Sequence, residues 1–456
     1  MAELVNDMTK GRPAGLILRF ALPLMIGNIF QQLYTTVDAI VVGKGVGVEA
    51  LAALGSAEWP NWLVTGLVIG FTQGFSVRIS QRFGAEDWKG LRKMTAMSVW
   101  LALGIAIAAT AVSLICSRPM LLALKTDPAV LEQALSYLRV LFAGIPVIMG
   151  YNVLSSILRA LGDSRTPLAA MVLAASINIV LDLVFVMVFH WGVVGAAAAT
   201  VFAQFCSCVF CFLAIRRISC LKMSREDWRL DWSAVWDLVR LGSPTAFQNG
   251  VIGIGGLAVQ YVINGYGFLF VAGFTATNKV YGILEIAASS FGYSMSTFAG
   301  QNLGAGQAGR IRSGVRIGAL MSVATAAIIA ALMLLFGRFI LSLFISGDPA
   351  QTEEVLRIAY HYLAYMCVTL PLLYLLWIYR SALMGLGDTF FPMVSGIAEL
   401  AMRMAMVLFM PHVIGMEAIY MAEPAAWIGA LAILSSVYYW RQGRLLKAEK
   451  AGSKFF

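Results

Sequence analysis

The sequence predicts an all-α membrane protein with twelve transmembrane helices, arranged as two pseudo-symmetric six-helix lobes. Three observations lead to this prediction. The chain is 60% hydrophobic and only 12% charged, with a mean hydropathy of +0.80, well outside the range of soluble domains. It contains twelve apolar stretches long enough to cross a bilayer, and its second half repeats landmarks of its first half.

Each predicted helix is an apolar stretch of about 20 residues or more, the length that a membrane-crossing helix requires. The first stretch is not a signal peptide, because its apolar part is too long, it contains Asp38, and no small-residue cleavage site follows. The strict alternation typical of a β-barrel is absent. The predicted helices cover residues 14–42, 51–77, 94–116, 130–158, 165–189, 192–215, 236–264, 269–298, 314–337, 355–384, 390–411 and 417–440.

The internal repeat is clearest at two turns, which read SILRALGDSRTP at 156–167 and SALMGLGDTFFP at 381–392. QRFG at 81–84 likewise corresponds to QNLG at 301–304, and Pro23 corresponds to Pro244. Such a repeat indicates a tandem duplication of a membrane half, an architecture typical of transporters. We therefore predict an N-lobe at 12–215, a linker at 216–235 and a C-lobe at 236–442.

The basic residues predict the orientation, because Lys and Arg are retained on the cytoplasmic side of a membrane. With the N-terminus inside, most of the 33 Lys and Arg residues fall in cytoplasmic segments, including the linker. We expect both termini to be cytoplasmic, in a multi-pass protein of a bacterial inner membrane. The net charge of +9 then faces anionic lipid headgroups and implies no nucleic acid. The outside loops hold Lys44, Arg118, Lys125, Arg338 and Arg357.

Four oxygen-bearing side chains are predicted to lie at one depth within the N-lobe. Asp38 lies about 28 Å along its helix from Arg19, and Asp182 lies about 26 Å along its helix from Arg165. Asn178 shares a helical face with Asp182, and Thr200 lies about 13 Å into the next helix. Intramembrane charges are expensive and usually functional, and two close carboxylates suit a shared proton whereas oxygen ligands suit Na⁺. The alternative is that the acids are interfacial and the amide and hydroxyl are interhelical packing groups.

The predicted C-lobe carries a different polar set. Glu399 and Arg403 are four residues apart on one predicted helix and form an intramembrane ion pair. This pair either neutralises itself structurally or takes part in coupling or substrate binding. Lys279 and Glu285 on another predicted helix, together with Gln248, are further candidates for coupling or substrate contacts.

Several motifs give the chain a resemblance to the multidrug and toxic compound extrusion (MATE) family. The resemblance covers about residues 12 to 440. It implies two six-helix lobes around a central cleft, alternating access, and export of organic cations coupled to H⁺ or Na⁺. The motifs are Pro23, QQLYTTVDAIVVG at 31–43, GFSVRISQRFG at 74–84, FAGQNLGAG at 298–306 and the paired Leu-Gly-Asp turns.

In the family that the chain resembles, the N-lobe cation site uses an Asp, an Asn and Asp four residues apart, and a Thr. These map onto Asp38, Asn178, Asp182 and Thr200, which would also hold Na⁺ if Na⁺ is the coupling ion. One departure concerns the seventh helix, where some members carry a functional Glu but this chain reads Phe-Gln-Asn at 247–249. The resemblance therefore implies coupling through the N-lobe.

The sequence predicts a multidrug efflux antiporter that exchanges amphipathic, mostly cationic compounds for H⁺ or Na⁺. Pro23 is the expected hinge of the first helix, because proline removes a backbone hydrogen bond, although a static kink is the alternative. We expect no cofactor besides the coupling ion, and a monomer whose partners are small organic cations and membrane lipids.

Other classes of function are less well supported by the sequence. It contains no Walker-type phosphate loop, so direct ATP hydrolysis is not expected. An enzyme would need clustered nucleophiles or metal ligands, which the sequence does not show. A flippase or exporter of a lipid-linked or other specific metabolite remains the alternative, and it would favour a cleft rich in Arg and Lys. A channel is less compatible with duplicated halves and paired carboxylates.

Overall fold

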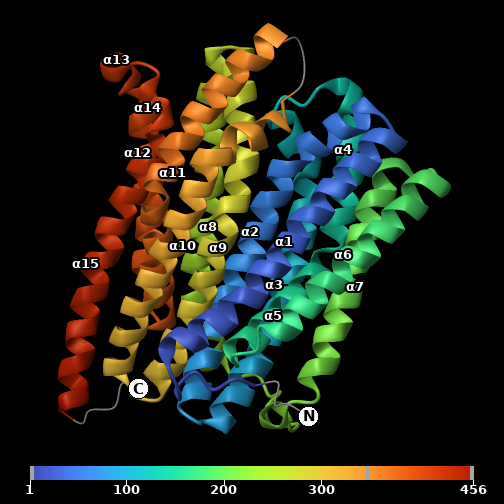
Figure 1. Ribbon diagram of the computed structural model, residues 1–456. Coiled ribbons are helices and arrows are strands. Elements are labelled where there is room, and N and C mark those ends of the chain that lie inside the picture. Colours follow the sequence, from blue (N-terminus) through green and yellow to red (C-terminus); the bar gives the residue numbers. More distant parts are fainter. Residues whose placement is uncertain (1–4, 346–348, 452–456) are drawn as a thin grey trace. The chain divides into compact units, whose positions relative to one another are not determined.

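The structure is a computed structural model that describes residues 5–345 and 349–451, and all regular secondary structure in those ranges is helical (Figure 1). Seven α-helices precede the linker. The sixth of them runs directly into a π-helix, η1, and the linker contains a short 3-10 helix, η2. The first-half elements are α1 (Pro13–Gly45), α2 (Val48–Gly84), α3 (Trp88–Ala123), α4 (Pro128–Ala143), α5 (Ile145–Ala160), α6 (Arg165–Asp182), η1 (Leu183–Val188), α7 (Gly192–Ile215) and η2 (Ser219–Leu221).

The second half has the same sequence of long helices, with short helical pieces before its last long helix. The elements are α8 (Trp232–Ile263), the 3-10 helix η3 (Asn264–Tyr266), α9 (Phe268–Gly304), α10 (Ala308–Ser342), α11 (Pro349–Gly385), α12 (Phe390–Leu408), α13 (Pro411–Ile414), α14 (Glu417–Tyr420) and α15 (Ala422–Lys450).

Every predicted membrane segment coincides with a helix or with a consecutive helix pair. Within the described ranges, nine helices are long and apolar enough to cross a membrane, and the count becomes ten when α4 and α5 form one span bent by 48°. The helices α9 and α15 have sufficient length but are less apolar than these nine, and α9 carries Lys279 and Glu285 in its interior. The fold is that of a twelve-helix, two-lobe membrane bundle.

The chain forms two compact units, each containing two separate segments of sequence. Unit 1 consists of Met1–Asp7 and Leu22–Gly250, and unit 2 consists of Met8–Ala21 and Val251–Phe456. Of the three boundaries, one precedes α1 and the other two fall inside long helices, α1 and α8, rather than in the linker. The lobe boundaries proposed from the sequence at 216–235 remain a prediction about the duplicated halves.

The repeated sequence motifs adopt the same local structure in both units. QRFG ends α2 and QNLG ends α9, and in each case the N–H of the following alanine donates to the glutamine carbonyl at 3.0 Å. The two Leu-Gly-Asp turns both place glycine in the left-handed region, with φ of 83° at Gly162 and 80° at Gly387. The backbone therefore repeats at the turns where the duplicated sequence is most similar.

The aspartates of these turns cap the following helices. Asp163 accepts hydrogen bonds from the N–H groups of Arg165 and Thr166 at 2.9 and 3.0 Å. Burial nevertheless raises the pKa of Asp163, because desolvation of the carboxylate outweighs these bonds. Asp388 instead receives Arg441 of α15, whose guanidinium donates to Oδ2 at 2.8 Å.

Helices α2 and α8 approach each other closely within unit 1, because both carry glycine where their backbones meet. A Cβ at Gly70 would lie 2.4 Å from the Cα of Ala246, and a Cβ at Gly74 would lie 2.4 Å from the Cα of Gly242. Small residues allow this approach, and they are enriched where membrane helices pack. The first half of α8 is thereby fixed within unit 1.

The segment that precedes α1 is held within unit 2 by side chains of α9. The N–H of Met8, which is fully buried, donates to Gln301 Oε1 at 2.8 Å, and Asn302 Nδ2 donates to the Met8 carbonyl at 3.2 Å. Farther along, Ser294 Oγ donates to the Ile17 carbonyl at 3.0 Å. The QNLG motif therefore also anchors the start of the chain.

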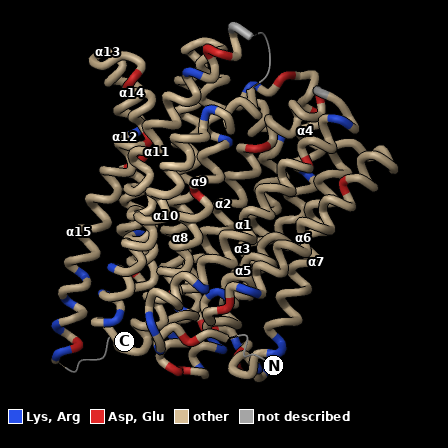
Figure 2. The backbone as a smooth tube through the Cα atoms, in the orientation of Figure 1, with Lys and Arg blue, Asp and Glu red and all other residues tan. Residues whose placement is uncertain are grey.

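Charged residues gather toward the helix ends, and the central parts of the helices carry few of them (Figure 2). This distribution is expected of a protein in a bilayer, where a charge in the hydrocarbon core is costly. The few charges away from helix ends therefore identify candidate functional residues.

Candidate functional site

The four N-lobe residues predicted from the sequence all belong to unit 1. Asp38 lies in α1, Asn178 and the terminal Asp182 lie one turn apart in α6, and Thr200 lies in α7. Asp38, Asn178 and Asp182 are buried, with exposed fractions of 7%, 1% and 0%, and Thr200 is partly buried. We refer to these four side chains as the oxygen site.

The structure brings the members of the oxygen site together in pairs. Asn178 Nδ2 donates a hydrogen bond to Thr200 Oγ1 at 3.3 Å, which joins α6 to α7. The carboxylates of Asp38 and Asp182 are close enough to repel each other electrostatically. The C-terminal part of α1 therefore lies near the end of α6. The predicted common depth thus corresponds to a common location in unit 1.

Most oxygen atoms of this site are buried without a hydrogen-bond donor. Asp38 Oδ1, Asn178 Oδ1 and both carboxylate oxygens of Asp182 have no partner in the described structure. A buried polar atom without a partner costs about 1–3 kcal/mol, so such atoms usually indicate a bound ion, a proton or a functional role. Four acceptor oxygens without donors form a suitable environment for a cation.

A small cavity adjoins the oxygen site. It contains about 140 Å³ of empty space and is lined by Tyr34, Ala174, Asn178, Thr200, Ala203 and Gln204. This space includes open solvent and leaves no room for a water molecule, so the cavity is too narrow for a drug. Tyr34 and Gln204 were not among the predicted site residues, although Tyr34 lies one turn before Asp38 on α1 and Gln204 one turn after Thr200 on α7. Their helical spacing from the predicted residues was the signal that could have identified them.

A π-helix follows the oxygen site immediately. The π-helix η1 begins directly after Asp182, and the N–H of Phe189 donates to the Val184 carbonyl at 2.9 Å, five residues back. Phe185 then stacks on Trp191, with ring centroids 4.8 Å apart, at the reversal into α7. π-Helical turns occur mostly as local widenings at functional sites, and here the wider turn starts at the more buried of the two acids.

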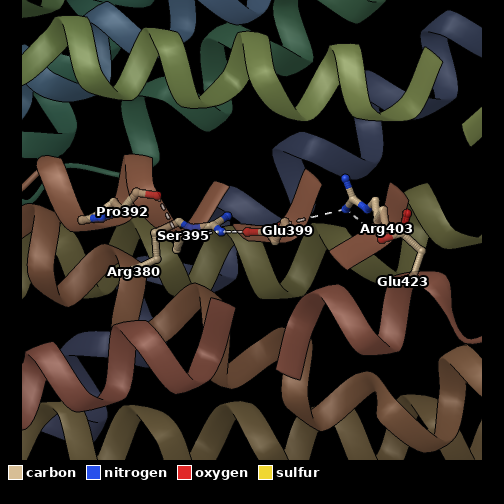
Figure 3. A network of polar contacts seen from close by, with 6 residues as sticks. All are labelled: Arg380, Pro392, Ser395, Glu399, Arg403 and Glu423. Carbon is tan, nitrogen blue, oxygen red and sulfur yellow. Dashed lines mark hydrogen bonds and ion pairs between the residues drawn. The ribbon is translucent and has the colours of Figure 1, made fainter. Parts of the chain in front are cut away.

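In unit 2, an ion-pair network joins α11, α12 and α15 (Figure 3). Glu399 lies between two arginines: one carboxylate oxygen pairs with Arg380, and the other lies 3.7 Å from Arg403 Nη2. Arg403 makes a closer pair with Glu423, at 2.8 Å. We call these four residues the arginine–glutamate network.

The network extends beyond the predicted Glu399–Arg403 pair, and three of its members are buried while Glu423 is partly buried. Arg380, Glu399 and Arg403 have exposed fractions of 6%, 4% and 7%. Arg380 and Glu423 were missed because each lies near the end of its helix, where the sequence indicated an ordinary cytoplasmic or interfacial charge. Only the packing of α11 and α15 against α12 reveals them as partners.

The remaining candidates lie in different surroundings. Glu285 in α9 is half-buried, accepts a hydrogen bond from the Trp377 indole, and is electrostatically coupled to the network. Lys279 in the same helix is exposed. Gln248, which the sequence grouped with the C-lobe, belongs to unit 1, because the first half of α8 lies there. Pro23 lies inside α1, directly beyond the boundary at which that helix passes from unit 2 into unit 1.

Comparisons with known proteins agree on one family. The family model described as MatE matches residues 23–184 and 244–415. The chain is 30% identical over 359 residues to the "Probable multidrug resistance protein YpnP" of Bacillus subtilis, covering 78% of this chain and 80% of the relative. It is also 24% identical to the "FAD transporter" of Shewanella oneidensis, covering 74% of this chain and 75% of that protein. The solved structure titled "Crystal structure of MATE in complex with MaL6" superposes with a TM-score of 0.90 at 24% identity, covering 98% of this chain and 100% of that one.

Proposed function

This chain belongs to the MATE family of membrane transporters, and from that membership we propose that it exports amphipathic organic cations in exchange for H⁺ or Na⁺ by alternating access. Multidrug resistance is the role named for its relative in Bacillus subtilis. The coupling ion, the substrate charge and the exchange mechanism are the proposed part. They rest on the residues of units 1 and 2.

The observation that carries the proposal is the set of unpartnered oxygen atoms around Asp38 and Asp182. These acids are buried and close in electrostatic terms, and Asn178 and Thr200 of the same site line a cavity too small for a drug. Burying two neighbouring carboxylates is costly unless a proton or a cation neutralises them. We therefore assign coupling-ion binding to the oxygen site, with Asp38 and Asp182 as the residues that exchange their neutralising ion.

The charge balance supports a cationic substrate. In unit 2, the buried Glu399 and the partly buried Glu423 and Glu285 lie near the bases Arg380 and Arg403, and a further base, Lys279 of α9, is exposed. The two arginines are already paired, so Glu285 is the acid left to contact a positively charged substrate. An anionic substrate, such as that named for the Shewanella oneidensis relative, would favour an excess of basic groups, which is not the pattern of these residues.

Exchange of the ion for the substrate requires that ion binding at the oxygen site changes which conformation of α1 has the lower free energy. An ion at Asp38 removes a buried charge on α1, and the cost of that charge differs between arrangements with different solvent access. Coupling requires this differential free energy and not merely binding. Pro23, located where α1 passes between units, is the proposed hinge because its ring prevents one backbone hydrogen bond.

The arginine–glutamate network is proposed to be structural. Each carboxylate pairs with at least one guanidinium, so the four charges neutralise one another within the bundle. Such a network holds helices in a defined register at little net gain in stability. We further propose a bacterial inner-membrane location with both termini cytoplasmic, consistent with the bacterial source of the named relatives.

Efflux from proteoliposomes tests the proposal. Purified protein is reconstituted, and loss of ethidium is measured under an imposed pH gradient, under an imposed Na⁺ gradient, and without a gradient. We expect concentrative transport under at least one of the two gradients and only equilibration without them. Equal rates in all three conditions would show a channel or uniporter. Transport of FAD but not of ethidium would show that the substrate is anionic rather than cationic.

A further inference from the structure

Gln204 is a partly buried polar residue beside the oxygen site and is not one of its four members. It lies in α7 one turn after Thr200, on the same helical face, and lines the cavity together with Asn178 and Tyr34. Its Oε1 atom is buried without a hydrogen-bond partner, whereas its side-chain amide lies within hydrogen-bonding reach of the Tyr34 hydroxyl. The amide nitrogen is thus partly satisfied and the carbonyl oxygen is not.

In Asn178, too, the side-chain nitrogen has a hydrogen-bond partner and the side-chain oxygen has none. Its Nδ2 donates to Thr200, and its Oδ1 is buried without a partner in a side chain that is 1% exposed. The cavity is therefore bordered by two neutral carbonyl oxygens that lack donors, in addition to the adjacent carboxylates of Asp38 and Asp182. Neither amide is needed to neutralise charge.

The chemistry of these oxygens distinguishes the two candidate ions. A proton binds to a carboxylate, and an amide oxygen is too weak a base to take it up in the physiological range. A hard metal cation, by contrast, is held by several oxygen ligands at once, and amide carbonyls serve as well as carboxylates in that role. A protonated aspartate can donate one hydrogen bond to a neighbouring amide oxygen, but one proton serves only one such oxygen, whereas a metal cation contacts several oxygens at once.

We propose that Gln204 is an additional ligand of the coupling ion and that it selects Na⁺ over H⁺ at this site. The inference rests on the proposed function, since it specifies the ion bound by the same site. In it, Asp38 and Asp182 supply charge, and Asn178 and Gln204 supply neutral oxygens from two different helices. Removing the Gln204 oxygen weakens Na⁺ binding more than it weakens proton uptake, because only Na⁺ uses that oxygen.

A purely structural role for Gln204 makes a different prediction. If the residue only holds the Tyr34 hydroxyl in place, its loss disturbs the site as a whole. Responses to Na⁺ and to H⁺ then decline by the same factor. The ratio of the two responses therefore separates a ligand from a positioning residue.

The test compares Gln204→Leu with wild type and with Gln133→Leu in proteoliposomes. Gln133 in α4 is a matched control, because its Oε1 is also buried without a partner but it does not line the cavity. Ethidium efflux is measured against Na⁺ concentration at equal pH on both sides, and separately under a pH gradient without Na⁺. Binding of ²²Na⁺ to the purified protein provides a readout that does not depend on transport.

We expect Gln204→Leu to raise the half-saturating Na⁺ concentration about tenfold or more, a typical effect of losing a group that supports an ion site. Its effect on pH-driven efflux should be at least several-fold smaller, and Gln133→Leu should match wild type in both assays. An unchanged Na⁺ response, or an equal decline in both responses, would overturn the inference. A wild-type protein that responds to H⁺ alone would also overturn it, while leaving the proposed exchange intact.

A second variant keeps the test decisive if Gln204→Leu does not fold. Gln204→Glu retains an oxygen ligand and adds a negative charge, so it should lower the half-saturating Na⁺ concentration at alkaline pH and make that value depend on pH. A half-saturating concentration equal to that of wild type across the pH range would contradict the assignment. Asp38→Asn, run in the same assays, reports separately on the proposed function.

Discussion

Buried aspartates occur in two environments in this protein, and the difference indicates their roles. Asp163 and Asp388 are buried at turns and accept hydrogen bonds from backbone N–H groups or from Arg441. Asp38 and Asp182 are equally buried but have oxygen atoms without donors. The first pair stabilises local structure, whereas the second pair has acceptor oxygens without donors, which supports the proposed ion or proton site.

Removing the charge of the second pair should stop coupled transport. Asp38→Asn and Asp182→Asn each preserve side-chain size but cannot titrate or neutralise a cation, so gradient-driven ethidium efflux should fall about tenfold or more. Asp127→Asn is the control: Asp127 caps α4 by accepting from the Ala129 N–H at 2.8 Å, and asparagine caps helices equally well. Efflux at the wild-type rate in both site variants would show that the oxygen site is not the coupling site.

The arginine–glutamate network predicts unequal rescue in a mutant cycle. Glu399→Gln alone leaves Arg380 without its carboxylate and should destabilise the protein by about 3–5 kcal/mol. Adding Arg380→Gln should restore more stability than adding Arg403→Gln, because Arg403 retains Glu423 at 2.8 Å. Thermal unfolding in detergent measures both cycles. Equal rescue by the two arginine variants would contradict the pairing, and a stable double variant unable to transport would show a functional role.

At the scale of helices, the sequence predicted where membrane segments lie but not how they are interrupted. The predicted helix at 130–158 is a pair, α4 and α5, bent by 48° at Gly144, and the predicted helix at 165–189 ends as the π-helix η1. Pro146 lies in the first turn after this bend, where proline cannot donate to the preceding turn. Nothing in the local sequence of Leu183–Val188 distinguishes π from α hydrogen bonding, since the wider turn depends on packing against α7.

The Leu-Gly-Asp turns should be sensitive to any side chain at their glycines. Gly162 has a φ of 83°, and a Cβ there would lie 2.0 Å from the Asn6 carbonyl oxygen. Left-handed backbone costs a non-glycine residue about 1–2 kcal/mol, and the steric clash adds to this cost. Gly162→Ala should therefore lower the midpoint of thermal unfolding by several degrees.

A helical glycine in open space provides the control for this variant. Gly104 lies within α3, and a Cβ there would meet nothing within 4 Å, so Gly104→Ala should be neutral or slightly stabilising. Similar midpoints for the two variants would mean that the strain at Gly162 is relieved elsewhere.

For the whole molecule, the sequence predicted the fold class and the two-fold repeat, because hydropathy and duplicated motifs are properties of the chain itself. The candidate site was only partly predictable. Helix depth selected Asp38, Asn178, Asp182 and Thr200, but the partners of Glu399 depend on which helices pack together. Arg380 and Glu423 lie 19 and 24 positions from Glu399 in sequence and become its neighbours, or those of Arg403, only in the folded bundle.

The membrane orientation can be tested by thiol labelling in a cysteine-free background. A cysteine at Ser224, an exposed residue of the linker, should react with a membrane-impermeant maleimide only when the cytoplasmic side is accessible. A cysteine at the exposed Lys125, between α3 and α4, should react from outside in intact cells. The reverse pattern would invert the orientation, and labelling of both from one side would contradict the number of crossings between them.

The placement of two unit boundaries within helices α1 and α8 has a consequence for dividing the gene. A cut in the linker would yield one polypeptide ending after α7 and another beginning before α8. The first would lack the part of α8 that packs on Gly70 and Gly74, and the second would lack Met8–Ala21, which Ser294 and Gln301 hold. Each fragment would carry the piece missing from the other. The two halves, when co-expressed, should therefore associate into the folded protein, whereas either half expressed alone should be degraded.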